Sequence, residues 1–277
     1  MDVSKLITEI LADLKANRLK LPTLPQVAIK INDVIDNPDA TAKKVSQIIS
    51  TDAALSARMI QVANSPMMRG NTTVENVQTA VTRMGMGVVR NIITSFLVNQ
   101  LFHTKHESLK KRLLLVWNHS ARVAAISHVI ANLFTSLKPD EAMLAGLVHD
   151  IGKLPLILKA ESIPALANNA NIMDALDEKL HPVLGKVIVQ TWGFSPEMVT
   201  AVAEHQNLNR DSEQLDLADI VTVANLLSYA GKPHRHIDVN WADVPAFKKL
   251  NLSPEDSIAA LEEARDEIAE IVKLLTT

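Results

Sequence analysis

Apolar residues recur at the spacing of an α-helix along almost the whole chain, and this pattern constrains the fold more than any other feature. In the first segment, one stripe holds Val3, Leu6, Ile10 and Leu14, which follow one another three or four positions apart. Such spacing places side chains on one face of a helix. Stripes of the same kind continue to the end of the chain, so the sequence predicts an all-α fold.

The composition favours the same fold class. Of the 277 residues, 8 are glycine and 3% are aromatic, whereas sandwiches and barrels of strands need turn glycines and favour aromatic residues. The formal charge of −3 gives no basic surface of the kind that binds nucleic acid or anionic lipid. No stretch approaches the roughly 18 apolar residues of a membrane span. We therefore expect neither a nucleic-acid partner nor a membrane association.

Prolines divide the helical pattern into segments. We expect a long helix from about Ser108 to Phe134, a helix beginning at Pro139, and a separate helix opened by Pro182, because proline fits the first turn of a helix. From these breaks we predict an N-terminal helical lobe over residues 1–103, a helical bundle over 104–230, and a C-terminal loop and helix packed on the bundle over 231–277.

The chain contains no cysteine, which excludes disulfides, thiolate nucleophiles and cysteine-based metal sites. The segment Met1–Leu21 is interrupted by charged residues and lacks the apolar region of a signal peptide. These observations favour a cytoplasmic protein. Any metal site must be made from histidine and carboxylate side chains.

The pair His149-Asp150 is the first candidate for chemistry, because of its surroundings. It ends the apolar helical run Met143–Val148, and Lys153 follows four residues after His149 and three after Asp150. If the helix persists, these three side chains share one side of it. A buried charge is costly without a partner, so such a cluster needs a counter-charge or a metal ion.

Further imidazole and carboxylate groups lie on other predicted helices, at His119, His181, His205 and Asp219. Imidazole and carboxylate together suit a divalent ion of Fe, Mn, Zn or Ni, and helical bundles build metal sites from inward-facing residues of several helices. Such an ion would activate water and polarise a phosphoryl oxygen, and Lys153 would complement the phosphate charge. The alternative for any single histidine is an ordinary core or solvated residue, so only the ordered set indicates a metal site.

The segment Gly146-Leu147-Val148-His149-Asp150-Ile151-Gly152-Lys153 resembles the signature of the HD-superfamily metal-dependent phosphohydrolases. The resemblance implies His119 as the first metal ligand and Asp219 as the last. His181 resembles the extra histidine of the HD-GYP branch, which hydrolyses cyclic di-GMP, and His205 resembles the first member of its next histidine pair. Gln206 stands in place of the second member, and no Gly-Tyr-Pro segment follows. These departures argue against hydrolysis of cyclic di-GMP.

The first half of the chain is similar to the HDOD family in the segments Leu21–Pro25, Val45–Leu55, Gln61–Pro66 and Ala80–Gly85. Together with the HD-like segments, the resemblance covers residues 21–230 in the expected order. It implies an all-helical bacterial signalling module with an HD-like bundle. Many members of the family have lost the metal ligands and have no established catalysis.

Three functional hypotheses follow. The first is an HDOD-type signalling module that retains an HD-like divalent metal site and acts through protein partners. The second is an active metal-dependent phosphohydrolase that takes a nucleotide or another phosphorylated small molecule, with Asp150 and Lys153 taking part in catalysis. The third is a metal-free scaffold in which the same residues form a buried hydrogen-bond network.

Overall fold

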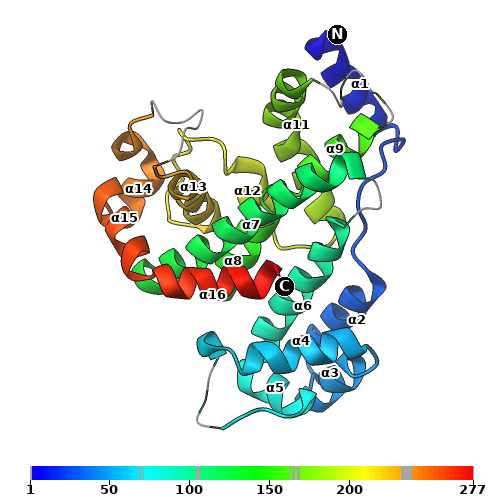
Figure 1. Ribbon diagram of the computed structural model, residues 1–277, viewed down its shortest axis with the longest axis vertical. Coiled ribbons are helices and arrows are strands. Elements are labelled where there is room, and N and C mark those ends of the chain that lie inside the picture. Colours follow the sequence, from blue (N-terminus) through cyan, green and yellow to red (C-terminus); the bar gives the residue numbers. More distant parts are fainter. Residues whose placement is uncertain are drawn as a thin grey trace.

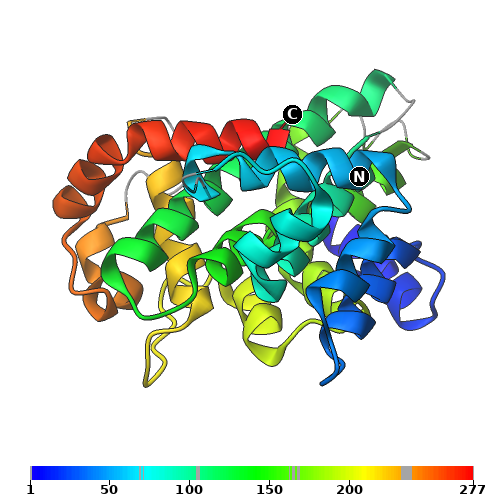
Figure 2. The same ribbon diagram turned by 90° about the horizontal axis from the view of Figure 1, so that it is seen from below.

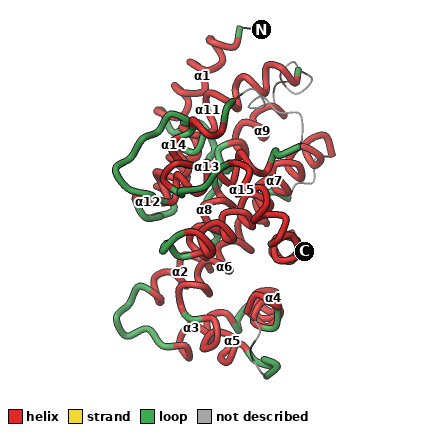
Figure 3. Tube along the Cα trace, turned by 90° about the vertical axis from the view of Figure 1, so that its left-hand side faces the viewer, coloured by secondary structure: helices red, strands yellow, loops and turns green. Residues whose placement is uncertain are grey.

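The structure is a computed structural model that describes residues 2–68, 70, 72–103, 107–161, 163, 166, 169–231 and 239–276. Within these ranges the secondary structure consists of helices, turns and loops, without a strand (Figures 1 and 3). The prediction of an all-α fold is confirmed. In the same ranges, no helix has the length and apolar character that crossing a membrane requires.

The lower part of Figure 1 is a lobe of short helices. It contains α2 (Gln26–Ile35), α3 (Ala42–Ile49), α4 (Ala53–Ala63), the short 3₁₀ helix η1 (Pro66–Met68) and α5 (Val77–Met84). Side chains before two of the helices stabilise their first turns, since Thr41 accepts a hydrogen bond from the amide of Lys44, and Asp52 accepts from those of Ala54 and Leu55. Helix α6 (Met86–Leu101) then runs from this lobe to the rest of the molecule (Figure 1).

The larger part of the molecule is a helical bundle built around one long helix. Its members are α7 (Glu107–Phe134), α8 (Pro139–Val148), α9 (Lys153–Glu161), α11 (Ala170–Thr191), α12 (Pro196–Glu204) and α13 (Leu217–Ser228). Helix α7 packs along α8 and α13, and α12 lies between α11 and α13. The predicted long helix and the predicted helix start at Pro139 are both present.

Helix α11 runs without a break through Pro182, so the prediction that this proline opens a separate helix is wrong. Proline inside a helix removes one backbone hydrogen bond and normally breaks or kinks the helix. Here the packed surroundings override that tendency, since His181 and Leu184 are fully buried, although Val183 between them is 43% exposed. The imidazole of His181 also contacts the carbonyl of Asp177 one turn earlier.

Both ends of the chain return to the bundle. Helix α1 (Val3–Lys15) packs against α11 (Figure 1), and the carboxylate of its Asp13 also lies 2.8 Å from Nζ of Lys159 on α9. At the other end are η2 (Trp241–Asp243), α14 (Pro245–Lys249), α15 (Pro254–Glu263) and α16 (Arg265–Thr276). Helix α16 packs along α7 and also reaches α6 and η1, so it bridges the two parts of the molecule (Figure 2). The first helix therefore contacts the bundle, although its residues fall in the predicted N-terminal lobe.

We expect Gly152→Ala to destabilise the fold strongly. A Cβ atom at this position would lie 1.9 Å from the carbonyl oxygen of His181 and 2.6 Å from the amide nitrogen of Gly185, and backbone atoms cannot move aside as a flexible side chain can. Overpacking typically costs about 1–3 kcal/mol of the free energy of unfolding, and so close a contact with backbone places the cost at the upper end of that range. Urea denaturation measures the loss.

The matched control is Gly87→Ala at the start of α6, where the nearest atom to a new Cβ is an Asp140 oxygen at 3.9 Å. Alanine favours helix over glycine, so the control is expected to be neutral or more stable by about 0.5–1 kcal/mol. Equal stability of the two variants would contradict the close contact at Gly152.

Candidate metal centre

The His149-Asp150 pair lies in a tight turn between two helices. Helix α8 ends at Val148, and the amides of Ile151 and Lys153 donate to carbonyls three residues earlier, at 3.0 and 2.9 Å. Lys153 is the first residue of α9, and its Nζ lies 2.7 Å from Oδ2 of Asp150. The predicted proximity of Lys153 to Asp150 is therefore present, but a turn brings the two residues together and not a continuous helix.

Four histidines from different elements surround the buried carboxylate of Asp150. On one side, Nε2 of His149 lies 3.3 Å and Nε2 of His119 lies 3.7 Å from Oδ2. On the other side, Nε2 of His181 lies 3.2 Å and Nε2 of His205 lies 3.8 Å from Oδ1. The structure thus brings together five of the six residues predicted as metal ligands, in two groups that share Asp150.

Backbone carbonyls fix the orientation of three of these imidazole rings. Nδ1 donates to a carbonyl in each case: His149 to Gly146 at 2.7 Å, His181 to Asp177 at 2.5 Å, and His205 to Val202 at 2.9 Å. A neutral imidazole that carries its proton on Nδ1 presents a lone pair on Nε2. All three lone pairs therefore point toward Asp150, which is the usual orientation of histidines that bind a metal.

The polar atoms of the cluster suit a divalent cation. Nε2 of His149 is buried and has no hydrogen-bond partner among the described residues. Nε2 of His181 lies 3.1 Å from Nε2 of His205, although both rings use Nδ1 as the donor, so two lone pairs face each other. Two nitrogens that bind one ion at about 2.1 Å lie roughly 3.0–3.4 Å apart. The site therefore fits an ion that accepts imidazole nitrogen and carboxylate oxygen, such as Fe, Mn, Zn or Ni.

Burial and charge set the protonation of the cluster. Burial lowers the pKa of His119 to about 3 and that of His181 to about 4, and it holds the pKa of His205 well below its usual value. Burial also acts to raise the pKa of Asp150, but His149 and Lys153 outweigh that effect and keep it well below the usual value. The centre therefore combines an ionised carboxylate at Asp150 with neutral imidazoles at His119, His181 and His205, which are the protonation states that a metal requires.

A cavity of about 540 Å³ opens above the cluster and is lined by His119, Asp150, Lys153 and His181. Its rim is acidic, since Asp174, Asp177 and Glu178 of α11 also line it. Lys153 is the basic side chain among the described lining residues, and it is already paired with Asp150. The cavity gives access to the cluster, but its charge favours a cation over an anion.

The structure does not bring Asp219 to the cluster. This residue is the third of α13, where it forms a capping box with Asp216. Its carboxylate lies 3.0 Å from Nζ of Lys249 and 3.2 Å from Nη1 of Arg210. Asp219 therefore fastens the start of α13 to α14, and its two cationic partners leave it unsuited to a metal ion.

The cavity residues that sequence reasoning missed include Asp177, Asn225 and Tyr229 as well as the other acidic residues of its rim. Asn225 lies on α13 two turns beyond Asp219, and its Oδ1 is buried without a hydrogen-bond partner among the described residues. Tyr229 stacks on His119 with ring centroids 5.0 Å apart, and its hydroxyl lies 3.2 Å from Nε2 of that histidine. The sequence did contain a signal for Asn225, since a polar amide side chain within the apolar run of α13 indicates a buried polar role.

Comparison with known proteins identifies the fold and the family. Residues 21–208 match the HDOD domain, which is more than half of the chain. The chain belongs to the HDOD family. A protein of Treponema pallidum (strain Nichols), described as uncharacterized, is 22% identical over 241 residues, which are 82% of this chain and 45% of that protein. The HDOD chain therefore spans less than half the length of that relative.

Solved structures show the same architecture. A candidate metal-dependent phosphohydrolase from Shewanella amazonensis SB2B is 31% identical, with a TM-score of 0.86 over 99% of both chains. An HDOD domain protein of unknown function from Geobacter sulfurreducens is 20% identical, with a TM-score of 0.71 over 99% of this chain and 98% of its own. A candidate signal transduction protein from Marinobacter aquaeolei VT8 is 18% identical, with a TM-score of 0.66 over 94% of this chain and 61% of its own.

We expect the metal-free protein to lose stability in mild acid. Burial holds the pKa of His181 at about 4 and that of His119 at about 3, against 6.5 for an ordinary histidine. As the pH falls below about 6.5 the unfolded chain therefore binds more protons than the folded chain, and the free energy of unfolding decreases. Each such group contributes a slope of up to about 1.4 kcal/mol per pH unit. Asp177 opposes this trend, since burial raises its pKa to about 6.

Urea denaturation at a series of pH values between neutral and mildly acidic measures this slope. His181→Gln is expected to make the slope shallower, because one buried imidazole no longer takes up a proton on unfolding. His103→Gln is the matched control at an exposed position, and it should keep the wild-type slope. A wild-type slope in His181→Gln would contradict the prediction.

Proposed function

We propose that this HDOD protein is a signalling module that holds one or two divalent metal ions on Asp150 and the histidines around it. The observation that supports the proposal is the division of four imidazoles into two pairs, one pair on each oxygen of Asp150. A metal-free scaffold would not need four histidines around Asp150, because each buried imidazole nitrogen without a hydrogen-bond partner lowers the stability of the fold. The output of the module is contact with a protein partner.

The residues around the proposed ions have separable roles. His149 and His119 would hold an ion on the Oδ2 side of Asp150, whereas His181 and His205 would hold one on the Oδ1 side. The carbonyls of α8, α11 and α12 orient the rings through their Nδ1 protons, which lowers the cost of ordering the ligands when an ion binds.

The alternative function is metal-dependent hydrolysis of a phosphoester. The likeness to the Shewanella protein and the cavity above the cluster favour it. A bound divalent ion would supply polarisation of a phosphoryl oxygen and activation of water, and Lys153 would face the phosphate. The acidic rim argues against this function, since Asp177 and Glu178 would repel a phosphate group, whereas the third rim carboxylate, Asp174, lies 3.8 Å from Arg112. We therefore place the binding module first.

Metal binding is tested on the full chain after chelation. We expect Mn²⁺, Zn²⁺ or Ni²⁺ to raise the melting temperature, because a ligand at one hundred times its Kd stabilises the folded state by about 2.7 kcal/mol. Elemental analysis gives the metal content of protein purified without added metal. His181→Gln should remove binding on the Oδ1 side while His149→Gln removes it on the Oδ2 side.

The control for both variants is His103→Gln, whose position is exposed and lies outside the cluster. It should bind as much metal as the wild type. If His149→Gln and His181→Gln also bind the wild-type amount, the ions lie elsewhere and the proposed centre is wrong. A wild-type chain without any metal and without a thermal shift would favour the metal-free scaffold.

Catalysis is tested separately, with the metal-loaded protein and a panel of phosphomonoesters, phosphodiesters and cyclic nucleotides. We expect no turnover above that of the His149→Gln variant, because the acidic rim disfavours anionic substrates. Release of phosphate or nucleotide by the wild type alone would overturn this expectation and establish the hydrolase.

A further inference from the structure

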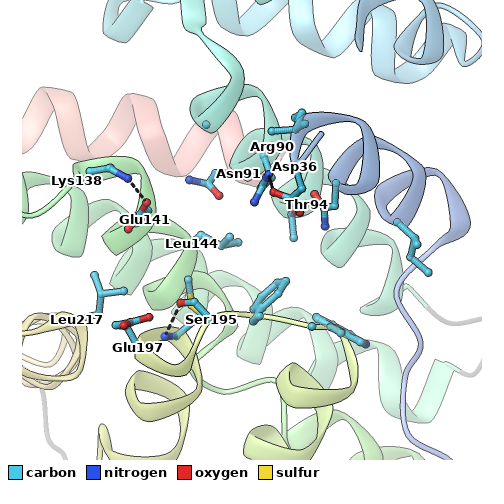
Figure 4. Close-up of a pocket in the computed structure, with 18 of the residues that line it drawn as sticks. Asp36, Arg90, Asn91, Thr94, Lys138, Glu141, Leu144, Ser195, Glu197 and Leu217 are labelled. Carbon is cyan, nitrogen blue, oxygen red and sulfur yellow. Dashed lines mark hydrogen bonds and ion pairs between the residues drawn. The ribbon is translucent and has the colours of Figure 1, made fainter. Parts of the chain in front are cut away.

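A second cavity, of about 620 Å³, lies between the N-terminal lobe and the bundle, and we call it the interlobe groove. Helices α2 and α6 form one wall, and α8, α12 and the start of α13 form the other. Figure 4 shows Asp36, Arg90 and Thr94 on the first wall, with Ser195 and Glu197 facing them across open space. The groove lies apart from the histidine cluster, whose residues line a different cavity.

The charges of the interlobe groove do not cancel. Arg90 is paired with Asp36, and Nζ of Lys138 lies 2.7 Å from the carboxylate of Glu141 (Figure 4). These two pairs use the basic side chains among the lining residues. Asp33 and Glu197 also line the groove, are exposed, and have no cationic partner among the described residues. The groove therefore carries two uncompensated negative charges, one on each wall.

Apolar side chains line the groove together with these charges. Ile29 of α2 is 47% exposed and Phe194 is half-buried, and both line the groove, as does the buried Leu144. Apolar groups left open to water beside fixed charges are typical of a surface that another molecule covers. The complementary ligand must present positive charge on both sides of an apolar group.

The helices of the bundle wall connect the interlobe groove to the histidine cluster. Helix α8 places Glu141 in the groove and delivers His149 at its other end. Helix α12 places Glu197 in the groove and ends just before His205. A ligand in the groove therefore contacts the same helices that position the candidate metal-binding side chains. Through these helices, metal binding at the cluster could alter the affinity of the groove for its partner.

We propose that the interlobe groove binds a segment of a partner protein in which Lys or Arg side chains flank an apolar residue. The proposal gives the signalling partner of the proposed function a place to bind. It depends on the groove alone, so it holds whether or not the cluster carries a metal ion. Charge complementarity selects a basic segment over an acidic one and makes the binding sensitive to salt.

The experiment measures the fluorescence anisotropy of a labelled peptide of alternating Lys and Leu, titrated with the full-length chain at low and high salt. We expect the wild type to bind this peptide at least about tenfold more tightly than a Glu–Leu counterpart. Asp33→Lys should weaken the binding of the basic peptide by about tenfold, because the exposed carboxylate of the groove is replaced by a repelling charge.

The matched control is Glu9→Lys, an identical charge reversal at an exposed position of α1 outside the groove. It should retain wild-type affinity. Equal weakening by both substitutions would mean that the peptide senses only the net charge, which would overturn the proposal. Formation of a dimer that Asp33→Lys abolishes would show that a second copy of the chain occupies the groove, and this result would overturn it as well.

The two proposals fail independently. Peptide binding is measured before and after chelation of metal. A groove-specific effect of Asp33→Lys in a chain that binds no metal would support the groove and reject the metal centre. Metal binding without any preference for the basic peptide would support the metal centre and reject the groove.

Discussion

The arrangement of the bundle depends on the interactions of the buried Asp150 carboxylate with the side chains around it. The residue is 1% exposed, and an ionised group at that depth is tolerated only when charges and hydrogen bonds surround it. Its partners come from α7, from the turn after α8, from the start of α9, from α11 and from the end of α12. A single side chain thereby imposes a common meeting point on five segments that are far apart in the sequence.

That meeting point explains local features that otherwise conflict with helix rules. The turn from His149 to Gly152 interrupts what could have been one continuous helix, and it turns Asp150 inward while leaving Lys153 free to reach it. Gly152 must lack a side chain because the backbone of α11 passes against it. Pro182 then lies inside a helix, directly after a histidine that the cluster requires. The cost of an internal proline is offset here by the packing of the buried residues His181 and Leu184 on one face of the helix.

Sequence patterns predict the elements of this protein better than their mutual orientation. Apolar stripes predicted the long helix α7, and the His149-Asp150 pair with its apolar run predicted residues that the structure places in the histidine cluster. Asp219 shows where such reasoning ends. Its residue type and its place in the order of the motif match those of a metal ligand. The direction in which its side chain points depends on where α13 begins, and the side chain pairs with Lys249, thirty residues further along the chain. Asn225 and Asp177 contact the cavity for the same reason, because folded helices bring their faces there.

The charges around the cluster favour the binding of a metal ion over the hydrolysis of a phosphoester. A hydrolase of phosphoesters needs positive charge around the anion as well as metal, whereas here the cavity rim carries Asp174, Asp177 and Glu178, and Lys153 is engaged by Asp150. The interlobe groove carries an excess of negative charge too. Helices α8 and α12 each reach from that groove to the cluster. If an ion at the cluster changes the affinity of the groove for its ligand, thermodynamic linkage requires the groove ligand to change the affinity for the ion by the same factor. If the proposed function holds, an ion at the cluster would be a structural signal to a partner protein, and the site could be retained without turnover.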